Sequence, residues 1–316
     1  MLLGWIGETA ALGTALCWAF TSVWFSAAGV RVGSLTVNML RMPIALVWFA
    51  LWGLVARGEV FPFDASAHAW VWLSISGLFG FAFGDLCLFR ALVVIGPRLA
   101  SLLMATAPPI TAVLGWLVLG ERLSLVAILG MALTTAGIAW VIAVRDPAHL
   151  GGAKVEQVPR EPAERRRFAL GVVLALGGAL GQAIGLVLSK YGMRDDDPFA
   201  SSQVRVLAGT IAFAAILTAM RRWPRVVRAF SDRTAMVQLG LGATFGPFLG
   251  VSLSLVAVQL TEAGIAASLL ATAPILVIPL AVRYGGEKVG WSALLGTVLA
   301  VLGVAILVGP GAMDEP

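Results

Sequence analysis

Long apolar stretches separated by short polar links make up nearly all of this chain. A helix that crosses a membrane needs about 20 consecutive residues of mostly apolar character. Ten stretches meet this requirement, and they cover residues 6–28, 35–55, 70–89, 100–119, 123–144, 168–188, 202–220, 235–258, 265–282 and 289–308. The remaining links are short except for the polar segment 145–167. The pattern therefore predicts an all-α integral membrane protein with ten transmembrane helices.

Two parts of the chain are nearly the same sequence. The stretch 101–139 is repeated at 268–305 once one residue is skipped. Matched positions then stand 166 residues apart, and they include Thr106 with Thr272 and Pro108 with Pro274. Weaker matches at a separation of 164 extend the repeat to other helices, for example Arg41 with Arg205. An internal repeat of membrane helices is typical of transporters.

The repeat divides the chain into two five-helix units, residues 1–144 and 168–308, joined by the basic link 145–167 and followed by the short tail 309–316. Because five is odd, the second unit must enter the membrane from the side opposite to the first. The halves are then inverted repeats, related by a pseudo-twofold axis in the membrane plane. Such a pair can expose a central site alternately to either side of the membrane.

Composition and charge agree with a membrane location. Hydrophobic residues make up 59% of the chain and charged residues only 12%, against roughly 25% charged in soluble proteins. Links after the odd-numbered helices hold fifteen Lys and Arg residues, not counting Arg90 at the end of the third helix, and those on the opposite side hold four. The positive-inside rule places the richer side in the cytoplasm and both termini outside. The net charge of +5 follows from this distribution and gives no reason to expect a nucleic-acid partner.

The segments 89–124 and 129–142, with a weaker echo over 255–289, carry a proline in the fourth helix, a Gly-Glu pair at its end and a glycine-rich fifth helix. In this compound pattern the chain resembles the EamA-type ten-helix family of the drug/metabolite transporter (DMT) superfamily over essentially its whole length. The resemblance implies export or exchange of small metabolites, often amino acids, without ATP hydrolysis. Members are commonly drawn with cytoplasmic termini, opposite to the charge count. We expect a multi-pass protein of the cell (inner) membrane.

Pro108 and Pro274 occupy matched depths in the fourth and ninth predicted helices. A proline lacks the backbone donor and clashes with the carbonyl four residues earlier, so one carbonyl in each helix is predicted to be free near mid-membrane. Matched interrupted helices indicate a transporter site where they line a cavity. The alternative is a packing kink, capped by Thr106 and Thr272. These four residues are candidates for substrate binding.

Arg41, Arg205 and Asp85 are charged residues inside predicted spans. A charge there costs a few kcal/mol unless it is paired or hydrated. Each arginine either binds a substrate carboxylate through its planar fork or has a structural role, such as a bridge from Arg41 to Asp85. Asp85 has no acidic counterpart, since Val251 occupies the matched position. A carboxyl group in an apolar site can bind and release a proton, so Asp85 is the candidate for proton coupling, with protons as a further partner.

Trp18 lies near the middle of the first predicted helix, and its matched position in the sixth holds Gln182. The pair either faces the central cavity, with Trp18 as a stacking surface and Gln182 as a hydrogen-bonding group, or takes part in ordinary packing. Phe83 and three further phenylalanines add to a predicted lining with few charges. Hydrophobic or aromatic amino acids and related metabolites therefore rank first as substrates, and nucleotide sugars, sugar phosphates or drugs are the alternatives.

Signatures of catalysis are missing from the sequence. No lysine follows a glycine, so there is no Walker loop, and the only histidines, His68 and His149, lie in predicted links. No Cys/His cluster has the spacing of metal ligands. We expect a transporter rather than an enzyme, without a metal or cofactor, that binds a small-molecule substrate within the lipid bilayer as a monomer or homodimer. A lipid-modifying membrane enzyme is the remote alternative.

Overall fold

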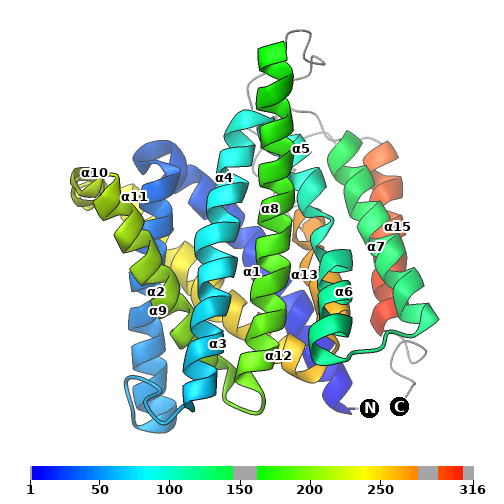
Figure 1. Ribbon diagram of the computed structural model, residues 1–316, viewed down its shortest axis with the longest axis horizontal. Helices are drawn as coiled ribbons and strands as arrows, with labels where there is room; N and C mark the ends of the chain where they lie inside the picture. The colour runs from blue at the N-terminus through cyan, green and yellow to red at the C-terminus, as the bar shows by residue number, and fades with distance from the viewer. Residues whose placement is uncertain (1, 145–161, 277–290, 309–316) are drawn as a thin grey trace.

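The computed structural model describes residues 2–144, 162–276 and 291–308 (Figure 1). These residues form helices and connecting turns, with no strand among them. Nine described helical segments are long and apolar enough to cross a membrane, and a shorter apolar helix covers Ala263–Leu276. The predicted all-α membrane fold is therefore confirmed. Most of the predicted link, 145–161, the second part of the predicted ninth span, 277–282, and the tail lie outside the described residues.

The first half contains the first five spans. The first is α1 (Leu2–Val32) and the second is α2 (Ser34–Arg57). The third joins three consecutive elements, α3 (Ala67–Gly77), η1 (Leu78–Gly84) and α4 (Asp85–Val94). The fourth is broken into α5 (Gly96–Met104) and α6 (Ala107–Leu119), and the fifth is α7 (Leu125–Val144).

The second half follows the same order. The sixth span is α8 (Pro162–Met193) and the seventh is α9 (Pro198–Ala219), followed by the short α10 (Trp223–Ala229). The eighth joins α11 (Arg233–Ala243), η3 (Thr244–Gly250) and α12 (Val251–Leu260). The ninth begins with α13 (Ala263–Leu270), and the tenth is α15 (Trp291–Val308).

Local sequence determines where several of these helices begin and end. Asp197 accepts hydrogen bonds of 3.2 Å from the backbone N–H groups of Phe199 and Ala200, which caps the start of α9. Gly58 ends α2 with φ 76° and Gly120 ends α6 with φ 71°. Glycine adopts this left-handed conformation without steric strain. These ends fix the depth at which each span presents its side chains.

The first span of each half packs against the other half. α1 packs against α11, η3 and α12 of the second half, and α8 packs against α3, η1 and α4 of the first. The two contacts are equivalent: a Cβ atom on Gly7 would touch Thr261, and one on the matched Gly171 would touch Ile95. This packing places the two halves around one pseudo-twofold axis, as inverted repeats require.

The two faces of the bundle differ in which spans begin on them. α1 begins near the lower edge of Figure 1, and α8 begins at the upper edge. We name the face where α1 begins the N side and the opposite face the link side. The fourth, sixth and eighth spans therefore end on the N side.

The third and eighth spans change from α-helix to π-helix for seven residues at matched positions, η1 and η3. The spans predicted over 70–89 and 235–258 are helical throughout, and the π-turns within them were not predicted from the sequence. Both segments are rich in glycine, and Pro247 in η3 has no backbone N–H to donate. The α-helical hydrogen-bond ladder is weak at such sequences, so a wider turn can form. π-turns inside α-helices are frequent at functional sites.

The glycines of the fifth and tenth spans form a seam within the chain. A Cβ atom on Gly296 would lie 3.1 Å from the carbonyl oxygen of Gly137, and Gly303 lies against Thr134 and Gly130. Backbones of α7 and α15 can approach this closely only because the residues between them are small. This seam therefore joins the two repeats to each other.

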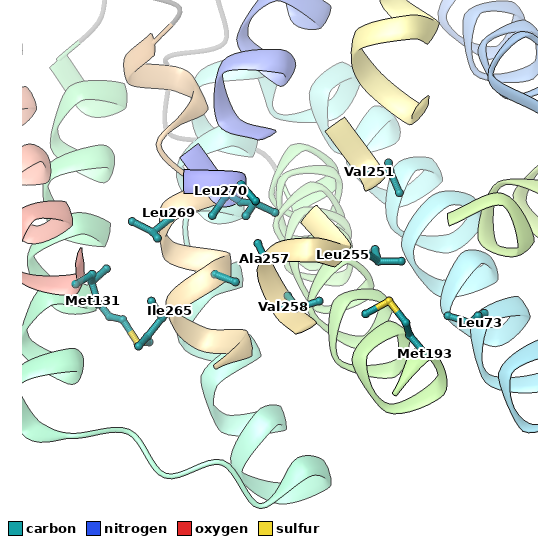
Figure 2. Close-up of a cluster of buried hydrophobic side chains, with 14 of the residues drawn as sticks. Leu73, Met131, Met193, Val251, Leu255, Ala257, Val258, Ile265, Leu269 and Leu270 are labelled. Atoms are coloured by element: carbon teal, nitrogen blue, oxygen red, sulfur yellow. The ribbon is translucent and has the colours of Figure 1, made fainter. Parts of the chain in front are cut away.

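The largest hydrophobic cluster also joins the two halves (Figure 2). Leu73 of α3 and Met193 of α8 lie near Leu255 of α12, and Ile265 of α13 lies near Met131 of α7. All five side chains are buried. Because the cluster draws on both repeats, neither half holds this core alone.

Candidate functional site

Two arginines at matched positions lie inside the bundle, Arg41 on α2 and Arg205 on α9. One turn earlier on the same helices stand Asn38 and Ser202, which are also matched, 164 residues apart. α2 and α9 pack against each other. The repeat therefore presents two equivalent polar positions on neighbouring helices of the two halves.

Arg41 has an acidic partner. Its guanidinium forms an ion pair and hydrogen bond with Asp85, the first residue of α4, and only 15% of the Arg41 side chain and 9% of the Asp85 side chain are exposed. The Arg41 guanidinium carbon also lies 5.6 Å from the ring centre of Phe25 on α1. The pair ties the second span to the third and neutralises both charges. This is the bridge predicted from sequence.

Arg205 has a different environment. Only 5% of the residue is exposed, and its guanidinium lies 5.2 Å from the ring centre of Phe81. Its Nε, like that of Arg41, has no hydrogen-bond partner among the described residues. The position that matches Asp85 is Val251, so the acid of the first half is absent from the second. Salt bridges found in the described residues do not include Arg205. A buried cation with an aromatic neighbour and no counter-ion has the chemistry of an anion-binding group.

Further buried polar atoms lie near the two arginines along the same helices. Asn38 Oδ1 and the hydroxyls of Ser201 and Ser202 are buried without hydrogen-bond partners in the described structure. Buried polar groups are normally satisfied, so unsatisfied atoms on both matched helices indicate places where a ligand or water could bond. An amide oxygen can accept from an ammonium group, whereas the guanidinium can donate to a carboxylate.

Trp18 and Gln182 lie at the two contacts in which the first span of one half packs against the other half. Trp18 Nε1 lies 2.8 Å from where a Cβ atom of Gly250 would be, at the end of η3. The backbone N of Gln182 lies 3.5 Å from the equivalent point at Gly84, at the end of η1. Each residue is therefore placed against a π-turn of the opposite half. Their roles as a stacking surface and a hydrogen-bonding group remain predictions.

The fourth span is broken where the sequence predicts. α5 ends at Met104, α6 begins at Ala107, and Pro108 occupies the first turn of the new helix. Thr106 donates a hydrogen bond of 2.6 Å to the carbonyl of Leu103, and in the ninth span Thr272 donates one of 2.7 Å to the carbonyl of Leu269. The threonines thus bond to the broken turns.

The predicted aromatic lining is divided between different places. Phe83 is 43% exposed and meets Phe79 edge to face, with ring centres 6.0 Å apart. Phe248 is buried in the hydrophobic cluster around α2 and α9, where it contacts Phe49. Phe81, which sequence reasoning did not select, is the aromatic residue against Arg205. Its signal was present: it stands one residue after Gly80 in the glycine-rich third span.

Two cavities lie away from these residues. One of about 150 Å³ lies where α1 meets α2 and is lined by Gly33, Leu217 and Arg222 among others. A second, of about 400 Å³, is apolar and lies between α5 and α7, with Leu102 and Trp140 in its wall. The buried polar residues of α2 and α9 are enclosed in this conformation.

Comparisons with known proteins place the chain in one group. The model of the EamA-like transporter family matches residues 5–143 and 169–309, one match in each half. Twenty-four chains of solved structures match. One of them, described only as a crystal structure of a protein, is 19% identical, and the alignment covers 95% of both chains with a TM-score of 0.69. That likeness concerns the fold. No curated protein matches the chain.

Proposed function

The chain belongs to the EamA-like transporter family of the DMT superfamily, and from this membership we propose that it exports or exchanges a small metabolite by alternating access. The central features are a buried unpaired guanidinium, two broken spans and two π-turns, all arranged around the pseudo-twofold axis. Interrupted helices in membrane transporters supply polar groups to a site while the surrounding halves move. The substrate site in this proposal lies between α2, α9 and the η1 segment.

The unpaired Arg205 is the observation that carries the substrate proposal. A fixed cation buried against Phe81 favours a ligand that combines a carboxylate with an apolar or aromatic body. Asn38 supplies an acceptor for a ligand ammonium group. Hydrophobic or aromatic amino acids have all three features. Trp18, Gln182 and Phe83, with the threonines and prolines of the broken spans, remain proposed contacts of the same substrate.

The alternatives within the superfamily are less well supported by the charges. A nucleotide sugar or sugar phosphate carries more negative charge than one guanidinium balances. Arg41 cannot contribute freely, because Asp85 already neutralises it. A neutral drug would leave Arg205 without an anion. An amino acid fits the single available positive charge best.

Proton coupling through Asp85 remains part of the proposal. In this conformation Asp85 is paired with Arg41, so proton transfer through Asp85 would require the pair to separate during the transport cycle. Flux through Asp85→Asn at several pH values tests the coupling. Lost pH dependence with retained substrate binding supports it, and unchanged pH dependence removes it.

Orientation in the cell (inner) membrane is proposed from charge. The short loop region of α10 on the link side carries Arg222, Arg225 and Arg228. On the N side, Arg57 pairs with Asp64 and Lys190 pairs with Glu121, which neutralises two of the four cations there. The positive-inside rule therefore places the link side in the cytoplasm. Labelling of a single cysteine near Gln157 from outside intact cells would contradict this orientation.

Ligand binding to the purified protein tests the substrate proposal. L-Phenylalanine and L-leucine are expected to raise the thermal unfolding temperature, whereas their amides, which lack the carboxylate, have little effect. Arg205→Gln is expected to weaken amino-acid binding by about 10- to 100-fold, the value of one charged hydrogen bond. Because it removes a buried unpaired charge, this variant should stay folded. Equal binding of acid and amide would contradict the proposal, and saturable uptake into proteoliposomes is the companion measurement.

A further inference from the structure

A second polar cluster lies on the N side, where the eighth span meets the ninth. Lys190, near the end of α8, donates hydrogen bonds of 2.6 Å to Glu121 Oε1 and to the carbonyl of Thr261. The other oxygen of Glu121 accepts a hydrogen bond of 2.8 Å from the backbone N–H of Ala263, the first residue of α13. The partners of Glu121, which follows the fourth span, therefore come from two other spans.

These three hydrogen bonds hold the N-side ends of the fourth, sixth and ninth spans together. Glu121 follows α6, Lys190 belongs to α8, and Ala263 begins α13. The Glu121 carboxylate therefore lies at the N-terminus of α13. The ninth span cannot move away from the fourth without breaking these bonds. We call the group formed by Glu121, Lys190, Thr261 and Ala263 the N-side tie.

Glu8 of α1 is buried beside the N-side tie. Only 1% of this residue is exposed, and its Oε2 has no hydrogen-bond partner in the described structure. The preceding residue, Gly7, packs directly on Thr261. The ammonium group of Lys190 is committed to Glu121, and Glu262 faces Glu8 as a like charge. Sequence reasoning missed Glu8, because it stands near the start of the first span rather than deep inside it.

At the equivalent junction of the other half, the positions that match Glu8 and Lys190 carry no charge, and Glu287, which matches Glu121, lies outside the described residues. The position that matches Glu8 is Val172, which packs against the buried Val94 and Ile95. The position that matches Lys190 is Ser26. An apolar contact of Val172 therefore stands on the link side where the N side has the carboxyl group of Glu8. The scaffold is symmetric here, but the chemistry is not.

We propose that Glu8 is a proton-binding site that controls a gate on the N side, closed when Glu8 holds a proton and open when it releases one. A buried carboxyl group without a counter-ion is accommodated far better as the neutral acid than as the carboxylate. If the N-side tie breaks and water enters, the carboxylate becomes hydrated and the proton leaves to solvent. The inference rests on the proposed alternating access, since it assigns one of the two gates.

The direction of the pH effect follows from proton linkage. The closed form binds one more proton than the open form, so raising the pH favours opening by up to about tenfold per pH unit for a single site. The charged groups that face Glu8 from the other spans act on this balance. Glu262 opposes its ionisation, and Lys190 can compensate it only after leaving Glu121. Glu8 is separate from Asp85, which already has Arg41 as counter-ion.

Alkylation of a single thiol on full-length purified protein tests the gate without any substrate. Cys17→Ser and Cys87→Ser remove the native thiols, and Leu123→Cys introduces a half-buried reporter that lies against Gly264 of α13. Maleimide rates are measured between about pH 5.5 and 8.5 and divided by those of a Phe63→Cys protein, whose reporter position is exposed on the same side. This division removes the intrinsic pH dependence of thiol reactivity.

We expect the normalised rate to rise with pH, by up to tenfold per unit, and to stay low and flat in Glu8→Gln. Glu59→Gln, which changes an exposed acid on the same side, should keep the rise. Lys190→Ala, which removes the N-side tie, should react fast at every pH. A Glu8→Gln protein with the same pH profile as its parent would overturn the proposal.

Infrared spectroscopy gives a second readout in case a variant folds poorly. A protonated carboxyl group absorbs separately from a carboxylate, so the folded protein near neutral pH should show an acid carbonyl band that Asp85→Asn retains and Glu8→Gln loses. If the band is absent from the parent, Glu8 is ionised and the gate proposal fails. Amino-acid binding at Arg205 is measured independently, so failure here leaves the substrate proposal untouched.

Discussion

Arg41 and Arg205 occupy the same position in the two repeats, yet among the described residues only Arg41 is paired with an acid. Asp85 neutralises Arg41, whereas the matched Val251 leaves Arg205 against the ring of Phe81. A buried pair holds two spans together, and a buried single cation lacks a partner that a ligand can supply. The comparison shows that duplication placed an arginine at the same position in both halves. The difference between Asp85 and Val251 then gives one arginine a structural role and leaves the other for ligand binding.

The largest effect is expected from breaking the paired arginine. Asp85→Asn leaves Arg41 buried without a counter-charge, which typically costs about 3–5 kcal/mol. The thermal unfolding temperature in detergent should fall sharply, and the double variant Arg41→Met/Asp85→Leu should recover most of the loss. Arg205→Gln, which changes the arginine that matches Arg41 in the second half, should not destabilise the protein. Equal losses from both single variants would contradict the distinction.

Features of the fold and the site could be predicted from the sequence only where they depend on local residue types. The spans, the repeat and the break before Pro108 follow from residue types alone, since apolar length and a missing backbone donor are local properties. The Arg41 to Asp85 bridge was one of two alternatives, because a sequence shows that a charge needs compensation but not which helix provides it. The structure selected the bridge for Arg41 and left Arg205 unpaired.

Other features depend on contacts between distant segments. The π-turns of η1 and η3 form where the first span of the opposite half packs against them. The hydrophobic periodicity of a single helix does not reveal this contact. Lys190 and Glu121 belong to different repeats, so their pairing could not be inferred from the neighbouring Arg122. Glu8 was overlooked because an acid near a span end is usually exposed.

The two halves also differ in packing where the first span of each half crosses a span of the other half. At the crossing of the third and sixth spans, a Cβ atom on Gly185 would lie 2.8 Å from the Cα of Gly80. The position that matches Gly185 is Thr21, which fills the other crossing against Gly246. Gly185→Thr therefore makes the crossings alike and should destabilise by about 1–3 kcal/mol through overpacking.

The control for this change is Gly240→Ala, because Gly240 has nothing within 4 Å of its Cβ position in the described structure. It should leave the thermal unfolding temperature unchanged or slightly raised, since alanine favours helix over glycine. If Gly185→Thr behaves like Gly240→Ala, the two crossings tolerate the same side chains and the packing difference has no consequence.

A smaller effect is expected from an exposed ion pair, which calibrates the buried one. A hydrogen bond of 2.8 Å from Arg31 lowers the pKa of Asp232 below its ordinary value. The contribution of this pair is therefore present above the ordinary carboxyl pKa of about 4 and is lost as the pH falls through the lowered value. The difference in unfolding temperature between the parent and Asp232→Asn should be small at neutral pH and vanish in acid. A difference in unfolding temperature that grows as the pH falls would contradict this expectation.

Val251→Asp tests the central claim most directly, because it gives Arg205 the acid that Arg41 already has. Phenylalanine binding to the purified variant is measured beside Val251→Asn, which changes the shape similarly without a charge. We predict that Val251→Asp loses at least tenfold in affinity for the amino acid, keeps or gains thermal stability without ligand, and that Val251→Asn loses much less. Unchanged phenylalanine affinity in a folded Val251→Asp protein would contradict the assignment of Arg205 as the carboxylate-binding group.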